Sequence, residues 1–212
     1  MIHAYQETYV NKAQSILGEA FDYAINTCGI SPDSFIKMFL ISSISKKMEK
    51  GDPKYIKGKS GIEVALDIIC EVKKEEFFVE PTINFIRTKE YWIGHVIAYY
   101  QWYSDKSFSN IFEAVTYNNL VIMYNTFHEA DISKFIDIMD ERIKDKFPET
   151  NLKRMRHLAG YSQSELAIKS GVKLRSIQMY EQRNKDINKA SVETIYKLSK
   201  TLNCEILDLI ER

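Results

Sequence analysis

The chain has 212 residues, enough for one large domain or two small ones. Its 45% hydrophobic and 27% charged residues, with only 8 Gly and 4 Pro, match ordinary globular usage and exclude global disorder and collagen-like architecture. Lys plus Arg and Asp plus Glu both total 29, so the formal net charge is zero at pH 7.

The balanced charge conceals an asymmetry along the chain. Residues 149–212 carry 12 Lys/Arg against 8 Asp/Glu, a net of +4, and the first 148 residues carry the opposite excess. Within residues 151–189, nine cations face three anions. Positive charge concentrated on a short segment indicates a polyanionic partner.

The three cysteines, Cys28, Cys70 and Cys204, are widely separated and form no metal-ribbon or redox motif. Their pattern is typical of a reducing cytosol. The N-terminus lacks a secretory signal pattern, and no apolar run approaches the roughly 18 residues of a membrane span. We therefore expect a soluble, cytoplasmic protein that needs no metal or cofactor and does not contact membranes.

Helical periodicity dominates the first 147 residues. One apolar stripe runs from Val10 to Ile25 and should end near Gly29. A second helix begins at Ser31-Pro32 and includes Phe35, Met38, Phe39 and Ile44 on one face; a third spans residues 62–72. Between them, residues 51–61 form a polar, Lys-rich connector, which we interpret as exposed.

Residues 74–88 are ambiguous and could include a short strand around residues 82–86. Helices follow at 89–103, around 107–115 and 117–124, and after Asp131, which is placed to cap the next one. That last stripe stops at Pro148, because proline disfavours helix in the residue before it. The sequence predicts a helical domain at 1–147, a linker at 148–150 and a second domain at 151–212.

The segment 91–103 is the richest in aromatic residues, and its rings go around the predicted helix rather than along one stripe. A helix that is apolar all round is either central to its domain or has a second face against a partner. Core packing explains most of these rings. Trp and Tyr are also favoured interface anchors, so a partner site stays open.

Residues 161–181, YSQSELAIKSGVKLRSIQMYE, hold the most specific pattern. Ser162 and Glu165 form a capping box that fixes a helix start. Gly171 can end that helix in a left-handed conformation, and a second helix starts near Lys173. Apolar positions at Leu166, Ala167, Ile168, Val172, Ile177 and Tyr180 are expected to be buried. Two short helices joined by a tight turn are the helix-turn-helix arrangement.

On these residues, the segment 151–211 resembles the Cro/C1 or XRE family of helix-turn-helix DNA-binding domains. The resemblance implies an all-α, lambda-repressor-like fold of five helices, at about 151–158, 163–169, 174–182, 191–202 and 204–211. The core would be closed by Ile195, Leu198, Leu202, Ile206 and Leu209.

The resemblance also implies roles for individual residues. Gln163 matches the glutamine that clamps a DNA phosphate. Arg175 and Gln178 would read base edges in the major groove, as guanidinium suits guanine and carboxamide suits adenine. The other DNA-binding candidates are Lys173, Leu174 and Met179 on the recognition helix, and Arg183 and Lys185, which would meet phosphates.

Three features of the first domain suggest other chemistry. Gly58-Lys59-Ser60 looks like the end of a phosphate-binding loop, but Pro53 stands where that motif requires Gly. The cluster at His128 to Asp131 is better explained as helix capping than as a metal site, and His95 as a packed histidine. Because no catalytic constellation emerges, we do not expect an enzyme.

The phrases EKGDPKY at 49–55, AYYQWY at 98–103 and HEADISKF at 128–135 give the whole chain a resemblance to bacterial XRE-type regulators encoded beside toxin-like genes. The principal hypothesis is a sequence-specific, dimeric DNA-binding regulator that represses its own operon. The second is an antitoxin-like protein whose first domain neutralises a toxin. A third, an enzyme tethered to DNA, would require a polar pocket around His95 or His128.

Overall fold

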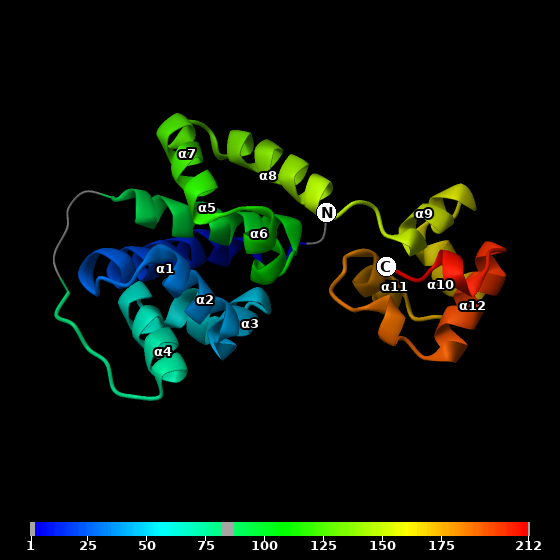
Figure 1. Cartoon of the computed structure of the whole chain (residues 1–212), viewed down its shortest axis with the longest axis horizontal. Coiled ribbons are helices and arrows are strands. Elements are labelled where there is room, and N and C mark those ends of the chain that lie inside the picture. The colour runs from blue at the N-terminus through cyan, green and yellow to red at the C-terminus, as the bar shows by residue number, and fades with distance from the viewer. Residues whose placement is uncertain (1–2, 82–86, 212) are drawn as a thin grey trace. The chain divides into compact units, whose positions relative to one another are not determined.

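The computed structural model describes residues 3–81 and 87–211 and divides into two compact units, Met1–Ile143 and Lys144–Arg212, here called the N-terminal unit and the C-terminal unit (Figure 1). The described residues contain helices and no strand, which confirms the all-α prediction. The short strand considered at residues 82–86 lies outside the described residues. None of the described helices combines the length and apolar character that crossing a membrane requires.

The N-terminal unit begins with a 3₁₀ turn at Glu7–Tyr9. Its helices are α1 (Val10–Asp22, extended by a π turn at Tyr23–Thr27), α2 (Pro32–Ile41), α3 (Ser43–Glu49), α4 (Gly61–Lys73), α5 (Lys89–Ser104), α6 (Phe108–Ala114), α7 (Tyr117–Phe127) and α8 (Ile132–Lys146). A further π turn, Lys54–Gly58, precedes α4.

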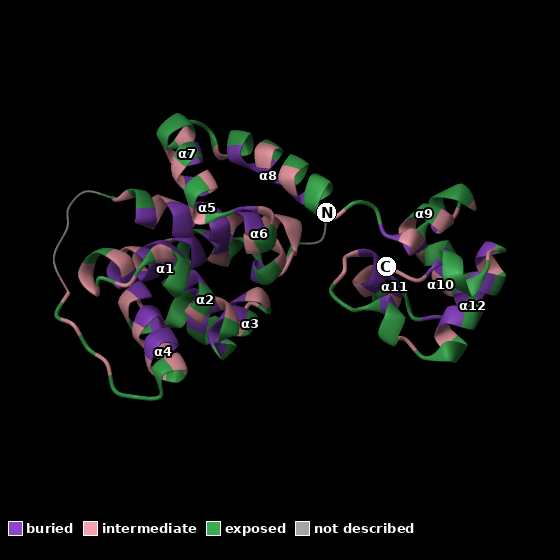
Figure 2. Ribbon diagram, viewed as in Figure 1, coloured by how far each residue is buried: buried purple, intermediate pink, exposed green. Residues whose placement is uncertain are grey.

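Helices α1 and α5 pack closely because glycine occupies their crossing point. A Cβ added at Gly94 would lie 2.4 Å from the Leu17 carbonyl oxygen, and one added at Gly18 would lie 2.8 Å from the Tyr91 carbonyl oxygen. Both contacts are shorter than any side chain permits. The crossing places α5 at the centre of the unit, with buried residues around its circumference (Figure 2).

Core packing accounts for much of the aromatic segment in α5. Tyr100 is fully buried and donates its hydroxyl to Asp140 Oδ1 at 2.7 Å. Trp102 is buried as well and donates its indole N–H to the Tyr5 carbonyl at 2.8 Å. Each ring therefore has an apolar environment and a partner for its polar atom.

Two expectations for this unit require correction. The predicted second helix is broken at Ser42, whose extended backbone separates α2 from α3, so Ile44 belongs to α3. The Lys-rich connector is not simply exposed, because Tyr55 and Ile56 are buried. Sequence patterning missed both features, since a single extended residue and two apolar residues among lysines leave no periodic signal.

The C-terminal unit contains α9 (Asn151–Leu158), α10 (Gln163–Ser170), α11 (Leu174–Glu181) and α12 (Val192–Leu202), with 3₁₀ turns at Ile187–Lys189 and Ile206–Asp208. The first four expected helices are present. The expected fifth helix is reduced to the 3₁₀ turn Ile206–Asp208, because the backbone groups that follow it form hydrogen bonds with side chains outside the turn. Asn151 Nδ2 donates to the Ile210 carbonyl at 2.7 Å, and the Glu211 N–H donates to Asn188 Oδ1 at 3.0 Å.

The hydrophobic core of the C-terminal unit includes the inward-facing residues of α10 and α11. It consists of the buried residues Leu152, Leu166, Val172, Ile177, Tyr180, Ile187, Ile195, Leu198, Leu202 and Leu209. Two residues expected in this core are exposed instead: Ile168 at 82% and Ile206 at 38%. Ile168 follows two inward positions of α10, and the 100° turn per residue carries it to the outer face.

Candidate nucleic-acid interface

Local sequence chemistry fixes the ends of the two helices that form the interface. The Ser162 hydroxyl accepts from the Glu165 N–H at 3.2 Å, and the Glu165 carboxylate accepts from the Ser162 N–H at 2.8 Å, which completes the predicted capping box. Hydrogen bonding with the backbone N–H and the side chain of Ser162 lowers the pKa of Glu165. Helix α10 therefore starts at Gln163, directly after its N-cap Ser162.

The turn between α10 and α11 depends on Gly171. Its φ of +67° lies in the left-handed region, as predicted, and its N–H donates to the Ala167 carbonyl at 3.0 Å. The next residue, Val172, is buried and anchors the turn to the core. Lys173 then starts α11 as its N-cap, so α11 leaves the turn at a fixed angle to α10.

A buried ion pair holds α9 against α11. Arg156 Nε lies 2.7 Å from Glu181 Oε1, Arg156 Nη2 lies 2.8 Å from Glu181 Oε2, and Arg156 Nη1 donates to the Tyr161 carbonyl at 2.8 Å. Arg156 is 6% exposed and Glu181 is 9% exposed. The hydrogen bonds that Arg156 donates to Glu181 raise the pKa of Arg156. This is the bidentate geometry that best satisfies a buried guanidinium.

Gln163 joins this network. Its Nε2 donates to Glu181 Oε2 at 2.8 Å from the first position of α10. A carboxamide nitrogen carries two hydrogens, so the second is free to donate outward. The ion pair thus orients, at the N-terminus of α10, the side chain to which the family resemblance assigns a DNA phosphate.

The candidate base-reading residues all lie on α11 or its N-cap. Lys173 and Arg175 are exposed, Leu174 is 37% exposed, and Gln178 and Met179 are half-buried. Arg175 and Gln178 are three residues apart and lie on the same helix face. Within the part of the chain that the structure describes, their side chains make no hydrogen bond or ion pair.

Arg183 and Lys185, the two candidate phosphate contacts beyond α11, have different surroundings. The Arg183 guanidinium forms an ion pair with Glu211 at 3.0 Å and donates to the Pro148 carbonyl at 3.1 Å. It links the two ends of the C-terminal unit, and a phosphate would compete with these partners. Lys185 is exposed, with its Nζ 5.5 Å from the centre of the Tyr180 ring.

The buried pair Arg156 and Glu181 is the part of the site that sequence reasoning missed. Arg156 is one of the nine cations counted within residues 151–189, but its charge is neutralised inside the unit by Glu181. A signal was present: Arg156 follows Leu152 at the four-residue spacing of the apolar face of α9. A cation on an apolar face requires a buried partner.

Among the described residues, no group of three His, Cys, Asp or Glu side chains is arranged to hold a metal ion. The cluster near His128 has capping contacts instead. His128 Nδ1 lies 2.9 Å from the Tyr124 carbonyl oxygen, and Asp131 Oδ1 accepts from the Ser133 N–H at 2.9 Å at the start of α8.

Residues 152–209 match the family described as Helix-turn-helix. Comparisons with curated proteins and with solved structures give no match. The matched residues span α9 to the last 3₁₀ turn and include the capped α10, the Gly171 turn and the exposed α11. The chain thus carries, in its C-terminal unit, a Cro/C1-type (XRE) helix-turn-helix domain, the DNA-binding module of regulators of that type.

Proposed function

We propose that the protein is a sequence-specific regulator of transcription that binds double-stranded DNA with α11 in the major groove and represses its own operon. The observation that carries this proposal is the exposed and unpaired face of α11, held by the buried Arg156–Glu181 pair. A polar helix face without intramolecular partners is available for base edges, and its rigid support reduces the cost of ordering it on binding.

The roles proposed for individual residues rest on the family resemblance and on the exposure and partners of each side chain. Arg175 and Gln178 read bases, while Leu174 and Met179 contact thymine methyl groups. Gln163 donates its second amide hydrogen to a phosphate, and Lys173 and Lys185 add positive charge beside it. Arg183 contacts phosphate only by sharing its guanidinium with Glu211.

A single reader of this size makes few base contacts, and specific recognition in this class uses two half-sites about one DNA turn apart. We therefore propose a homodimer on an inverted repeat. The prediction is that the operator is palindromic and that binding weakens steeply with added salt, because phosphate contacts release counterions.

The direct test is selection of bound fragments from the host genome with purified full-length protein. We expect one or a few palindromic promoter sites, including that of its own operon, to be enriched by the wild type and not by the double variant Arg175→Ala plus Gln178→Ala. Lys200→Ala, an exposed cation on α12, is the matched control and should retain enrichment. Equal enrichment by the double variant would refute reading by α11.

A second candidate concerns the N-terminal unit, which has a buried core of its own. An antitoxin-like role would give this unit a protein partner, with DNA binding serving autoregulation. Co-expression with the neighbouring gene product tests it. The antitoxin-like role requires that the two proteins form a complex that survives purification and that the neighbouring gene product harms cells when it is expressed alone. If neither is observed, the antitoxin-like role is refuted.

A further inference from the structure

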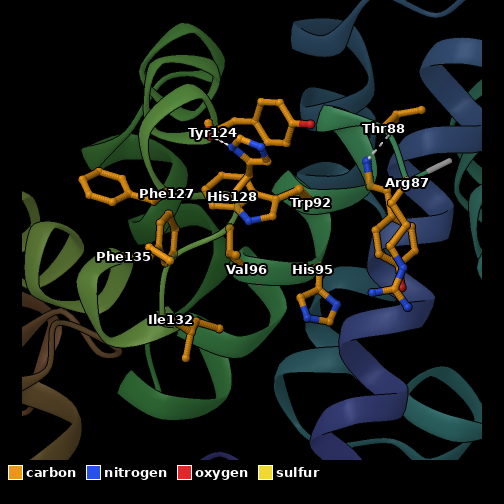
Figure 3. A pocket seen from close by; sticks show the side chains of 12 residues that line it. Arg87, Thr88, Trp92, His95, Val96, Tyr124, Phe127, His128, Ile132 and Phe135 are labelled. Atoms are coloured by element: carbon orange, nitrogen blue, oxygen red, sulfur yellow. Dashed lines mark hydrogen bonds between the residues drawn. The ribbon is translucent and has the colours of Figure 1, made fainter.

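The N-terminal unit contains a pocket of about 290 Å³ between α5, α7 and α8. Its lining includes His95, which we predict from sequence to be a packed histidine, and His128, which we predict to belong to a helix-capping cluster (Figure 3). The residues assigned to DNA all belong to the C-terminal unit, and none of them lines the pocket.

Aromatic rings form one side of this pocket. Figure 3 shows Trp92, Phe127 and Phe135 together there, with Tyr124 beside them. Trp92 packs edge-to-face on Phe135, with ring centres 5.7 Å apart and planes at 82°, and on Tyr124 at 5.6 Å and 67°. Walls of this kind suit a flat apolar ring, and the volume is at the lower end for ligand sites, which limits the occupant to one or two rings.

The other side of the pocket is polar and positive. The Arg87 guanidinium lies 4.9 Å from the centre of the Tyr91 ring, and the His95 ring stacks on the same tyrosine at 5.8 Å. Arg87 is exposed and makes no ion pair with any described residue. Of the described residues that line the pocket, Arg87 is the one with a permanent charge, and none is a carboxylate.

His95 supplies an unsatisfied polar atom. Its Nδ1 is the only buried side-chain nitrogen or oxygen in the described part of the chain without a hydrogen-bond partner. Such atoms are rare in folded proteins and call for an explanation. Burial, and then the positive charge of Arg87, lower the pKa of His95, so its imidazole is neutral at pH 7 and can donate one hydrogen bond and accept another.

We propose that this pocket binds a small aromatic carboxylate, with its ring against Trp92 and Phe135 and its carboxylate at Arg87 and His95. The Arg87 guanidinium makes no ion pair with any described residue, and its planar fork matches the bidentate geometry of a carboxylate. An ammonium ligand would suit the aromatic wall but not the charge of Arg87. The site would make the N-terminal unit a receptor for a small molecule, whatever the C-terminal unit binds.

Titration calorimetry on the full chain tests this proposal with two acids, phenylacetate and indole-3-acetate, and with their neutral amides. We expect at least one acid to bind at 1:1 stoichiometry with a Kd below about 1 mM and to change tryptophan emission, because Trp92 lines the pocket. The matching amide should bind roughly tenfold more weakly, because it lacks the charge that pairs with Arg87.

Variants separate the pocket from other surfaces. Arg87→Gln should weaken the acid by roughly tenfold and leave the amide unchanged, while Lys134→Gln, an exposed cation of α8 outside the pocket lining, should change neither. Arg87 is exposed and makes no ion pair with any described residue, so we expect its replacement to leave the fold intact. The proposal is overturned if neither acid binds, if acid and amide bind equally to the wild type, or if Arg87→Gln has no effect.

Discussion

Arg156 and Glu181 form a buried two-point ion pair in the C-terminal unit, with nitrogen to oxygen distances of 2.7 and 2.8 Å. One residue belongs to α9 and the other ends α11, so the pair fixes the recognition helix to the rest of the domain. Glu181 also accepts from Gln163, which extends the network to the start of α10.

Replacing one residue of this ion pair should destabilise the C-terminal unit strongly. Arg156→Met leaves the Glu181 carboxylate buried without its partner, and we expect a loss of about 3 to 5 kcal/mol of stability in the C-terminal unit. Amide hydrogen exchange of α9 to α11 in the full chain measures this loss. The double variant Arg156→Met plus Glu181→Leu should recover most of it, because no uncompensated charge remains.

The control for that measurement is the exposed pair of Lys197 and Glu193 on α12. Lys197→Met should cost less than about 1 kcal/mol, because solvent screens this pair. A loss for Arg156→Met no larger than that of Lys197→Met would contradict the structural role of the buried pair.

Lys185 should increase the affinity for DNA of any sequence without affecting sequence specificity. Lys185→Gln removes one phosphate contact, so we expect binding to every DNA sequence to weaken together and the slope of log K against log salt to fall by about 0.9. Binding measured at several salt concentrations, on the operator and on unrelated DNA, gives both quantities.

Arg175→Ala provides the contrast. Loss of a base contact should cost about 1 to 3 kcal/mol on the operator and much less on unrelated DNA. If Lys185→Gln and Arg175→Ala reduce binding to both DNAs by the same factor, the division between phosphate and base contacts is wrong.

The crossing of α1 and α5 should be sensitive to a single methyl group. Gly94→Ala places a Cβ against the Leu17 carbonyl, and we expect a loss of about 1 to 3 kcal/mol in urea unfolding followed by tryptophan emission. Both tryptophans, Trp92 and Trp102, belong to α5 and report on this unit.

Gly29→Ala is the matched control for the same substitution. Gly29 has a φ of +67° and nothing within 4 Å of an added Cβ, so the cost there is the left-handed backbone alone, about 1 kcal/mol. A Gly94→Ala protein as stable as the Gly29→Ala protein would show that the helices separate without penalty.

Glu90 should make the N-terminal unit sensitive to acid. Burial acts to raise the pKa of this carboxyl, but hydrogen bonds from Asn26 at 3.1 Å and Tyr117 at 2.8 Å outweigh it, and the pKa is lowered. A lowered folded pKa means that the ionised form stabilises the fold above about pH 4.3, the ordinary value for Glu, and that this contribution is lost as pH falls through the folded pKa.

The variant Glu90→Gln tests this linkage. We expect it to cost about 1 to 3 kcal/mol at pH 7, because hydrogen bonds to a charged acceptor are replaced by weaker ones, and to cost progressively less toward pH 3. Urea unfolding at several pH values measures the difference from the wild type. Glu76→Gln, at an exposed position, should show no such trend; a pH-independent cost for Glu90→Gln would contradict the assignment.

Local chemistry was predictable where it depends on neighbours in the chain. The capping box at Ser162 and Glu165, the left-handed Gly171 and the inward Val172 all follow from sequence, because helix caps and turns are formed by residues a few positions apart. The family resemblance placed the boundaries of α9 to α11 within one residue.

Features that join distant residues could not be predicted in this way. The aromatic content of α5 was compatible with a core helix or with a partner surface. Which of its rings are buried and which line the pocket depends on how α5 packs against α1, α7 and α8. The final turn failed as a predicted helix because side chains of Asn151 and Asn188, 59 and 23 positions away, take its backbone bonds.

The sequence by itself determined an all-α chain and a helix-turn-helix with an exposed recognition helix, because periodicity and capping are local properties of the chain. Only the tertiary structure decided that Arg156 is a structural ion pair rather than a surface cation, that Gln163 is oriented by Glu181, and that His95 faces a pocket. Burial depends on which elements meet in space, and it sets whether a charged or polar side chain needs an internal partner or remains available for a ligand.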